Sequence, residues 1–398
     1  AAAKASQVLP SMLGAYGART ILVLFQNPAE LRATGGIPGA FLVIRAENGT
    51  LRPIDQATAA AGLGTFPTPV LPLTDEQVAL YTERLGRYPA DVNVTPHFPT
   101  AAALAAEMYR RRSGTTVDTV VATDPVALSY LLATLGPVSV ASGPVLTAEN
   151  AVRVLLSDIY ATMDGRAQDR YILDVALAVF DRLTQGVPDP PAAIAALAQA
   201  ATEHRILVWS AHESEQEVID GTVLAGALLD DDPAHPTVGV YLNDGSGAKL
   251  GYYINGSARL VAGECHPDGR RMLTLRLTLT STAPAEGLTD SVLGLGLAGD
   301  PYTVRTNVLV VSPTRGALAE MNLDGTSVAF GQGVEQRRAV GVLTVDLAPG
   351  QTRELVVQIL TQKYVESTIE LSPTLRITPG VNPWAIAVEA TQNCPIAD

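Results

Sequence analysis

The pattern of apolar residues changes at Asp230–Pro233, and this change limits the folds open to the chain more than any other feature. Before it, strand-like apolar runs alternate with helix-like stretches, which is the pattern of a sheet covered by helices. Val117–Ala122, for example, runs through the turn Thr123-Asp124-Pro125 into a helical pattern over Val126–Leu135. Helical patterns also cover Thr147–Tyr160 and Ala167–Leu183.

After the change, short runs rich in Val, Leu and Thr recur between Gly, Pro and Asp residues, as in an all-β domain. Arg271–Thr280 alternates between apolar and polar residues at period two, which is typical of a strand with one face in water. We therefore predict a layered α/β domain over residues 1–232, followed by a β-sandwich domain over residues 233–398.

The formal net charge of −13 excludes several classes of partner. It repels phosphate backbones and anionic lipid surfaces. The tightest basic run, Arg110-Arg111-Arg112, falls at the end of a predicted helix, where the helix dipole favours cations. We therefore predict no nucleic-acid partner. No apolar run reaches the roughly 18 residues of a membrane-spanning helix, and no signal peptide is recognisable.

The two cysteines, Cys265 and Cys394, both fall in the predicted β-rich half. Their separation excludes the C-x-x-C spacing of zinc and thioredoxin-like sites. A long-range disulfide formed in an oxidising compartment is our prediction. Two unrelated buried thiols are the alternative.

Arg19–Arg52 contains the densest group of candidate site residues. Its apolar runs Thr20–Phe25 and Ala40–Ile44 are predicted strands. The segment between them, QNPAELRATGG, is longer than the about two to five residues that reverse a chain between two strands. We expect this segment to form part of a site.

Three residues of this segment carry groups suited to binding or catalysis, namely Asn27, Glu30 and Arg32. Loops are also polar for reasons unrelated to function. In that alternative, Asn27 caps a short turn while Glu30 and Arg32 are solvated.

Two phrases, FQNPAELRATGG at residues 25–36 and VYLNDGSGAKLGYY at residues 240–253, resemble the domain-of-unknown-function family numbered 4012. Members of that family occur with cell-surface polysaccharide machinery and usually carry an N-terminal membrane anchor. The resemblance implies an extracytoplasmic protein at the cell surface, held by an anchor that precedes Ala1.

The order of features in the first half is similar to that of the LytR-CpsA-Psr family, whose members move glycan polymers from a polyprenyl-pyrophosphate carrier onto the cell wall. Arg32 stands in the first loop and Asn93 in the second segment. Asp124 precedes a helix that ends in Leu135-Gly136-Pro137-Val138, and Asp164–Arg170 opens a long helix. The resemblance implies a LytR-CpsA-Psr-like α/β domain and a polyprenyl-phosphate-linked glycan as partner.

The chain departs from that family at two places. Leu31-Arg32-Ala33-Thr34 stands where the family has R-S-D-T, so the Asp that would hold a metal is absent. Arg170-Tyr171-Ile172 stands where the family has R-Q-Q. Mg²⁺ is the one cofactor that the resemblance implies, and no residue is assigned to it.

Arginines suit a pyrophosphate because their guanidinium groups bind its oxygens in pairs and stay protonated. Arg166 and Arg170 are four residues apart, near the N-terminal end of a predicted helix, which favours anions. With Arg32, they are the predicted phosphate ligands. The alternative is that they pair with Asp164, Asp169 or Asp174 on a solvated helix face.

Asp124 and Glu30 are the candidate catalytic carboxylates, since either could act as base on an acceptor hydroxyl. The alternative for Asp124 is structural, because Thr123-Asp124-Pro125 has the form of a helix cap followed by a first-turn proline. Asn27 and Asn93 are predicted to bind substrate.

Three functions are therefore open. The first is transfer or hydrolysis of a glycan carried on a polyprenyl-(pyro)phosphate. The second is a non-catalytic surface scaffold or polysaccharide-binding protein. The third is a glycosidase that uses paired carboxylates such as Glu30 and Asp124, for which their separation in space would decide.

Overall fold

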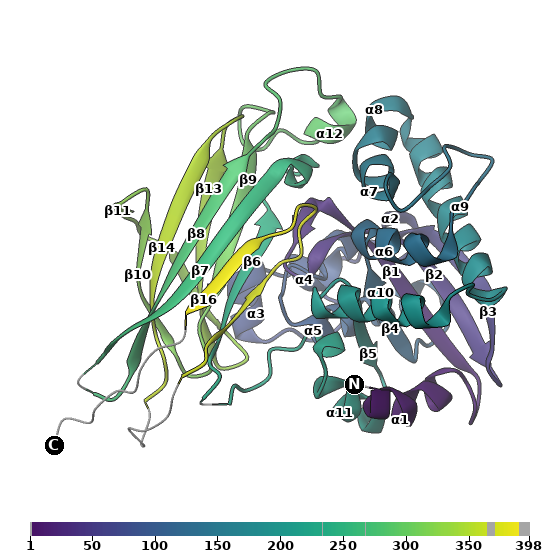
Figure 1. Cartoon of the computed structure of the whole chain (residues 1–398), viewed down its shortest axis with the longest axis horizontal. Coiled ribbons are helices and arrows are strands. Elements are labelled where there is room, and N and C mark those ends of the chain that lie inside the picture. Colours follow the sequence, from purple (N-terminus) through teal and green to yellow (C-terminus); the bar gives the residue numbers. More distant parts are fainter. Residues whose placement is uncertain (1, 233, 267, 364–370, 390–398) are drawn as a thin grey trace. The chain divides into compact units, whose positions relative to one another are not determined.

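The structure, a computed structural model, describes residues 2–232, 234–266, 268–363 and 371–389 (Figure 1). It divides into two compact units. The first contains the residues up to Leu73 together with Glu83–Ala227, and the second contains Thr74–Thr82 together with the residues from Leu228 onward. The short segment Thr74–Thr82 thus leaves the first unit in sequence and packs within the second.

A five-stranded sheet forms the centre of the first unit, in the order β3-β2-β1-β4-β5. Its strands are β1 (Arg19–Arg32), β2 (Gly35–Glu47), β3 (Thr50–Thr58), β4 (Thr119–Thr123) and β5 (Leu207–Ser210). Only β1 and β4 run parallel, with Ile21 opposite Thr119, and the remaining neighbours are antiparallel. The first domain is therefore a mixed α/β layer, as the sequence predicted.

The segment between the two predicted strands is not a long loop. β1 continues to Arg32 and β2 begins at Gly35, so only Ala33 and Thr34 lie between the strands. The extra residues are absorbed by irregular pairing between Phe25 and Gln26 and between Asn27 and Leu31. Such bulges are what allow a strand to carry inserted polar residues while it remains paired.

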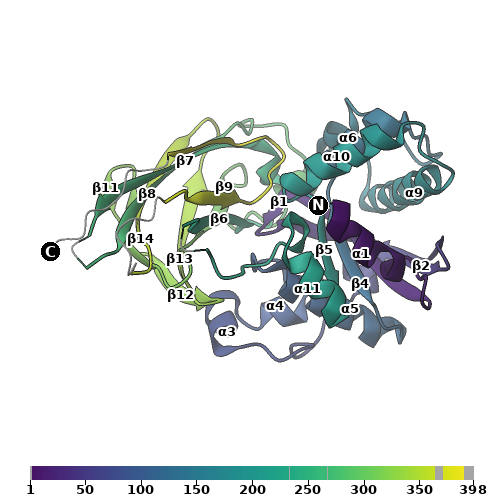
Figure 2. The same cartoon turned by 60° about the horizontal axis from the view of Figure 1, so that its bottom comes forward.

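One face of the sheet is closed by α5 (Phe98–Ser113). The ring of Phe41 on β2 meets that of Tyr109 on this helix, with centroids 5.7 Å apart. Leu22 and Leu24 point to the same face of β1 and are buried. These buried side chains make the face a packed core. Figure 2 shows α5 below the sheet.

The other face carries α6 (Pro125–Leu135) and α9 (Gly165–Thr184), with α10 (Pro190–Thr202) packed against α6. Phe180 of α9 contacts Leu42 and Ile44 of β2. The shorter helices of this unit are α1 (Ala2–Met12), α2 (Ala59–Gly62), α4 (Arg84–Arg87), η1 (Pro89–Asp91), α7 (Ala151–Arg153), α8 (Ile159–Thr162), α11 (Glu213–Asp220) and η3 (Val223–Ala225).

The helix predicted over Thr147–Tyr160 begins only at Ala151 and is interrupted. Val154–Asp158 forms a π-helical turn, in which the N–H of Ile159 bonds to the carbonyl of Val154. A π turn widens the helix locally and redirects the side chains around it. It separates α7 from α8, which carries Tyr160.

The second unit is a β-sandwich of two sheets that lie face to face in Figure 1. One sheet has the order β11-β10-β14-β8-β7-β16 and the other β12-β13-β9-β6-β15. The strands are β6 (Thr237–Asp244), β7 (Ile254–Cys265), β8 (Arg271–Ser281), β9 (Val304–Val311), β10 (Ala317–Leu323), β11 (Thr326–Ser327), β12 (Gly331–Glu335), β13 (Arg338–Leu347), β14 (Thr352–Leu360), β15 (Thr374–Ile377) and β16 (Ala385–Glu389). The short helices η4 (Leu250–Tyr253) and α12 (Asp290–Leu293) lie between strands.

Two further features confirm the predicted sandwich. β8 alternates as its sequence indicated, with Leu273, Leu275 and Leu277 all buried. The sheets also meet closely, since a side chain at Gly341 of β13 would collide with Met321 of β10 at 2.4 Å.

The inserted segment forms the helix α3 (Asp75–Tyr81), which packs against β12 at the edge of its sheet. Thr74 and Gln77 close its N-terminus with a capping box. The Tyr81 hydroxyl bonds to the Glu335 carboxylate, and Gly333 leaves room for Leu80. The helix thereby covers an otherwise open strand edge.

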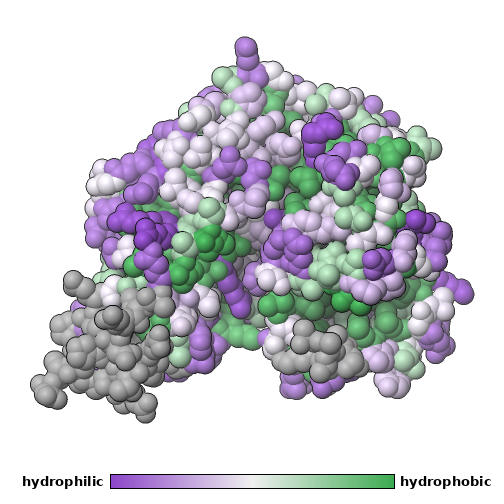
Figure 3. Space-filling view, viewed as in Figure 1, coloured by the Kyte–Doolittle hydropathy of each residue, from purple (hydrophilic) through white to green (hydrophobic). Residues whose placement is uncertain are grey.

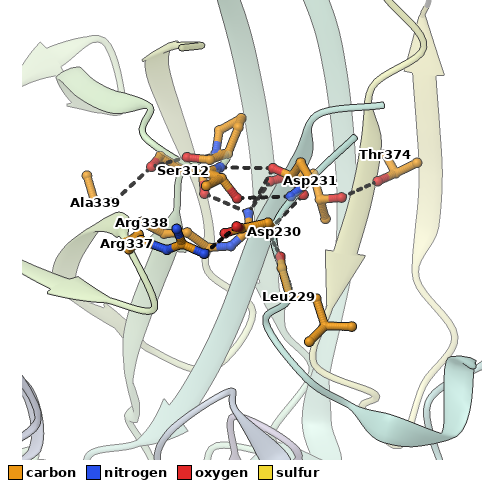
Figure 4. A network of polar contacts seen from close by, with 11 residues as sticks. Leu229, Asp230, Asp231, Ser312, Arg337, Arg338, Ala339 and Thr374 are labelled. Carbon is orange, nitrogen blue, oxygen red and sulfur yellow. Dashed lines mark hydrogen bonds and ion pairs between the residues drawn. The ribbon is translucent and has the colours of Figure 1, made fainter. Parts of the chain in front are cut away.

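A buried arginine anchors the start of the second unit (Figure 4). Both terminal nitrogens of Arg338 donate to the Asp231 carboxylate, at 2.7 and 3.1 Å. They also donate to the carbonyls of Leu229, Thr237 and Ser312. Because one side chain joins three segments, it fixes the path of the chain into β6.

The predicted disulfide lies outside the described residues, because Cys394 falls beyond residue 389. Within the described part of the chain, none of the helices is both long enough and apolar enough to cross a bilayer.

We expect Arg338→Ala to lower the free energy of unfolding of the second unit by about 3–5 kcal/mol, because it leaves the buried Asp231 charge unpaired. Urea unfolding followed by Trp384 fluorescence in a Trp209→Phe background measures this change. Arg337→Ala is the matched control. Its ion pair with Asp230 is exposed, so the loss should stay within about 1 kcal/mol. Equal losses for the two variants would contradict the assignment.

Candidate functional site

An apolar cavity of about 330 Å³ lies on the face of the first sheet opposite α5. Its floor is formed by β1, β2 and β4, and its walls by α6, α9 and the π-helical turn. Aliphatic and aromatic side chains make up most of the lining, for example Val23, Leu42, Leu128, Leu155, Val175 and Val179. This composition and size are typical of a small-molecule site.

The cavity exists because β1 is covered completely on one face only. Leu22 and Leu24 are fully buried beneath α5. Val23 and Phe25, which alternate with them, are only half-buried, although their side chains are equally apolar. The helices on that side therefore stand apart from the sheet and leave part of its apolar face unfilled.

Polar side chains line one end of the cavity. Gln26 and Asn27 follow the parallel part of β1, and Thr123 and Asp124 stand at the end of β4. The fifth is Tyr160 of α8. The carboxyl ends of parallel strands are where α/β sheets commonly bind ligands. We call this group the polar end of the cavity.

Asn27 and Tyr160 are joined directly. The Asn27 Nδ2 donates to the Tyr160 hydroxyl at 2.7 Å, and its Oδ1 accepts from the N–H of Ala29 at 3.0 Å. The two bonds fix the Asn27 amide, so it presents a defined edge to the cavity. Tyr160 is buried, and it is held at the cavity by this contact.

Two carboxylates lie near this pair. Burial raises the pKa of Tyr160, and the negative charges of Glu30 and Asp169 raise it further. Burial also raises the pKa of Asp169 itself. Glu30 comes from β1 and Asp169 from the second turn of α9, so the polar end collects acidic side chains from two separate elements.

Arg32, a predicted phosphate ligand, is already engaged. Its Nε donates to the carbonyl of Ala90 and its Nη1 to that of Leu31, each at 2.9 Å. Its Nη2 lies 3.5 Å from Glu30 and 3.7 Å from Asp91. The side chain is buried, and these contacts attach the β1–β2 hairpin to the segment that follows α4.

Asn93 also holds the hairpin in place. Its Nδ2 donates to the Thr34 hydroxyl at 3.1 Å and to the Gly36 carbonyl at 2.8 Å. The Gln26 side chain donates to the same hydroxyl at 3.1 Å. The Asn93 Oδ1 is buried and makes no hydrogen bond among the described residues. These buried contacts support the site from behind the strands.

Asp124 has the structural role that was its alternative interpretation. Its Oδ1 accepts from the N–H of Ala127 and caps α6, at 2.8 Å. Its Oδ2 pairs with Arg205 Nη1 at 2.9 Å, and both side chains are buried. Burial raises the pKa of Asp124, and the Arg205 charge opposes that rise. Both carboxylate oxygens are therefore occupied.

Arg166 and Arg170 are exposed. In the described part of the chain, none of their predicted alternative partners pairs with them, namely Asp164, Asp169 and Asp174. At about 100° per residue, they lie some 120° and 160° around α9 from Ile172, which lines the cavity. Their Cβ atoms thus point away from the lining. Asn27 and Asp124 both line the cavity, and Glu30 lies near Tyr160 without being part of the lining. Arg32 is not brought together with Arg166 and Arg170 among the contacts of the described residues.

The residues near the polar end do not fit a magnesium site. Among the described residues, no group of three or more His, Cys, Asp or Glu side chains could hold a metal. Asp91 and Glu30 both face Arg32, and Asp124 faces Arg205, so each of these carboxylates already has a cationic partner. Mg²⁺ usually takes oxygen ligands in octahedral geometry.

Sequence reasoning missed the cavity and three residues beside its polar end. Tyr160 falls in a segment read as an ordinary helix, and the π turn that redirects it has no recognised sequence signal. Asp169 was considered only as an ion-pair partner. Arg205 stands just before a predicted strand, far along the chain from its partner Asp124.

Residues 16–160 match a family described as a protein of unknown function (DUF4012), which confirms the resemblance carried by FQNPAELRATGG. The match ends before the second phrase at residues 240–253. No curated protein matches the chain.

Three solved structures illustrate the structural likeness. The transcriptional regulator yvhJ from Bacillus subtilis is 13% identical over 51% of this chain and 77% of its own, with a TM-score of 0.29. B. subtilis TagV is 13% identical over 52% of this chain and 82% of its own, with a TM-score of 0.28. A putative nutrient binding protein from Legionella pneumophila is 10% identical over 36% of this chain and 54% of its own, with a TM-score of 0.20.

All three TM-scores lie below 0.5, so no activity is carried over from these proteins.

We expect Gly36→Ala to destabilise the first unit by more than about 4 kcal/mol, because a Cβ there would lie 2.1 Å from the carbonyl carbon of Asn27. Urea unfolding followed by Trp209 fluorescence in a Trp384→Phe background measures the loss. Gly39→Ala on the same strand is the control, since its Cβ would meet Phe25 O at 3.7 Å. If Gly36→Ala lowered the free energy of unfolding as little as the control, the close approach of Gly36 to the Asn27 backbone would be refuted.

Proposed function

We propose that the first unit binds the apolar chain of a polyprenyl-(pyro)phosphate carrier, and that the protein transfers or hydrolyses the glycan on that carrier outside the cytoplasmic membrane. The observation that carries this proposal is the apolar cavity with its single polar end. The family match over residues 16–160 supports a role in the cell envelope, through the association of that family with surface polysaccharide machinery.

The lining favours an apolar chain over a sugar. Side chains such as Leu42, Leu131 and Val179 offer no hydrogen bonds to hydroxyl groups. A sugar placed there would lose its water without replacement, which costs several kcal/mol for each unpaired polar group. A hydrocarbon chain gains about 25 cal/mol for each Å² that it removes from water.

The polar end suits the head group of the carrier. Asn27 and Tyr160 bring polar groups to the place where the apolar lining stops, whereas the Gln26 amide is engaged by Thr34. Arg166 and Arg170 do not line the cavity. They remain our candidates for the phosphate because their exposed side chains are long and lie in the first turns of α9, the helix that carries Asp169. The guanidinium nitrogens of Arg32 already face backbone carbonyls and carboxylates of the protein. Arg32 would therefore position the Glu30 carboxylate and would not bind the phosphate itself.

Glu30 is our candidate for the base. In the transfer step, the oxygen of an acceptor hydroxyl attacks the sugar carbon, and the bond from that carbon to the phosphate oxygen breaks. The bonding electrons leave with the carrier phosphate, and Glu30 takes the proton of the hydroxyl. With water as the acceptor, the same step is hydrolysis.

A non-catalytic role is the second candidate. It is favoured by the engagement of Arg32 and Asp124, which leaves two predicted site residues without a direct part in chemistry. The protein would then hold a lipid-linked glycan for presentation. A glycosidase is not proposed, because both oxygens of Asp124 are occupied by the α6 cap and Arg205.

We expect Ala176→Phe to weaken binding of farnesyl monophosphate at least tenfold, because the added ring would fill the cavity that Ala176 lines. Titration calorimetry on the whole chain measures the dissociation constant. Ala60→Phe is the matched control, since Ala60 is exposed on α2. Unchanged binding in a folded Ala176→Phe variant would contradict the site, as would no binding by the unaltered protein.

We expect Glu30→Gln to slow release of prenyl pyrophosphate from a prenyl-pyrophosphate-linked disaccharide by about 10²–10⁴-fold while farnesyl monophosphate still binds. Chromatography of the released prenyl pyrophosphate measures the rate. Glu149→Gln, at an exposed carboxylate of the same unit, should release it at the normal rate. Binding without any release by the unaltered protein would support the non-catalytic role instead.

A further inference from the structure

The surface helix α10 carries no charged residue. Its thirteen residues, PPAAIAALAQAAT, contain neither acid nor base. Ala193 and Ala200 are buried, while Ile194 is 67% exposed and Leu197 43% exposed. A helix at the surface of a soluble domain normally presents charged and polar groups to water. The outer face of α10 is therefore apolar where water would be expected, and such a face is commonly covered.

The outer face of α10 is continuous with the cavity. Leu197 lines the cavity and is also exposed at the surface. The same is true of Leu183, a residue near the end of α9 whose exposed fraction is 36%. Figure 3 shows green hydrophobic residues on the surface over α10 and the helices beside it. The apolar lining thus reaches the surface, where it joins the uncharged helix.

This opening lies far from the polar end. α9 runs from Asp169, near Tyr160, to Leu183, a rise of about 21 Å at 1.5 Å per residue. Arg182 of α9 donates to the carbonyl of Leu135, where α6 ends, and Ala193 of α10 packs against the same leucine. The ends of α6 and α9 and the start of α10 therefore surround the apolar opening.

We propose that the outer face of α10, with Leu183, rests in the surface layer of a lipid bilayer, and that the carrier chain extends from the cavity into the bilayer through this opening. The inference rests on the proposed function, because a chain longer than the cavity needs an apolar medium for its remainder. A helix that lies in the interface buries its apolar side chains among the lipids.

The charge of this region decides which bilayer it fits. α10 has no Lys or Arg, and the chain as a whole carries −13. Attachment to anionic lipids normally uses clusters of basic residues. Binding through α10 should therefore depend on apolar contact alone, so it should occur on zwitterionic vesicles and should not weaken as salt is added.

The test is flotation of the whole chain with vesicles of phosphatidylcholine, at low and high salt. Ile194→Asp should lower the vesicle-bound fraction about tenfold, because the exposed Ile that would lie among the lipids is replaced by a charge. Ile386→Asp is the matched control, since Ile386 is 52% exposed on β16 of the second unit, and it should leave flotation unchanged.

Farnesyl monophosphate binding separates this inference from the proposed function. Ile194 does not line the cavity, so Ile194→Asp should bind this soluble ligand with normal affinity. Normal ligand binding without flotation of the unaltered protein would overturn the bilayer contact and leave the proposed function standing. Loss of self-association in Ile194→Asp, with flotation unchanged, would overturn it in favour of a second copy of the chain.

Discussion

The close crossing of the β1–β2 hairpin is the constraint on which the candidate site depends. Gly36 lies against the backbone of Asn27 at a distance that no side chain would allow. This crossing directs Asn27 toward Tyr160, while Asn93 and Gln26 meet at the Thr34 hydroxyl behind it. The FQNPAELRATGG phrase is thus first a device for building a tight, irregular hairpin. Its functional groups are placed by that hairpin.

The second determinant is the unequal covering of the sheet. α5 packs fully onto one face, whereas α6 and α9 leave apolar strand residues such as Val23 half-buried. Filling that space with side chains would stabilise the domain. Leaving it open produces a cavity suited to a hydrocarbon chain, with polar groups where β1 and β4 end. The same apolar lining continues to the surface at Leu183 and Leu197.

Particular residues show how far sequence reasoning reached. The Asp124 cap, the capping box at Thr74 and the alternation in β8 were readable, because each depends on neighbours within a few residues. The roles of Arg32 and Arg205 could not be predicted from the sequence, since each depends on partners far along the chain. The prediction of a long segment between two strands after Phe25 was wrong, because bulges allow the polar residues to stay within β1. Whether the predicted site residues act as assigned stays a prediction.

The sequence by itself determined the fold class and the hairpin phrase within the stretch that matches a family of unknown function, because periodicity and short motifs act locally. Only the tertiary structure decided which groups meet. It buried Arg32 among carbonyls and carboxylates, turned Arg166 and Arg170 away from the cavity lining, and brought Tyr160 to the polar end. The physical reason is that a side chain's partners are set by how helices pack on the sheet, and that packing depends on contacts between residues far apart in the chain.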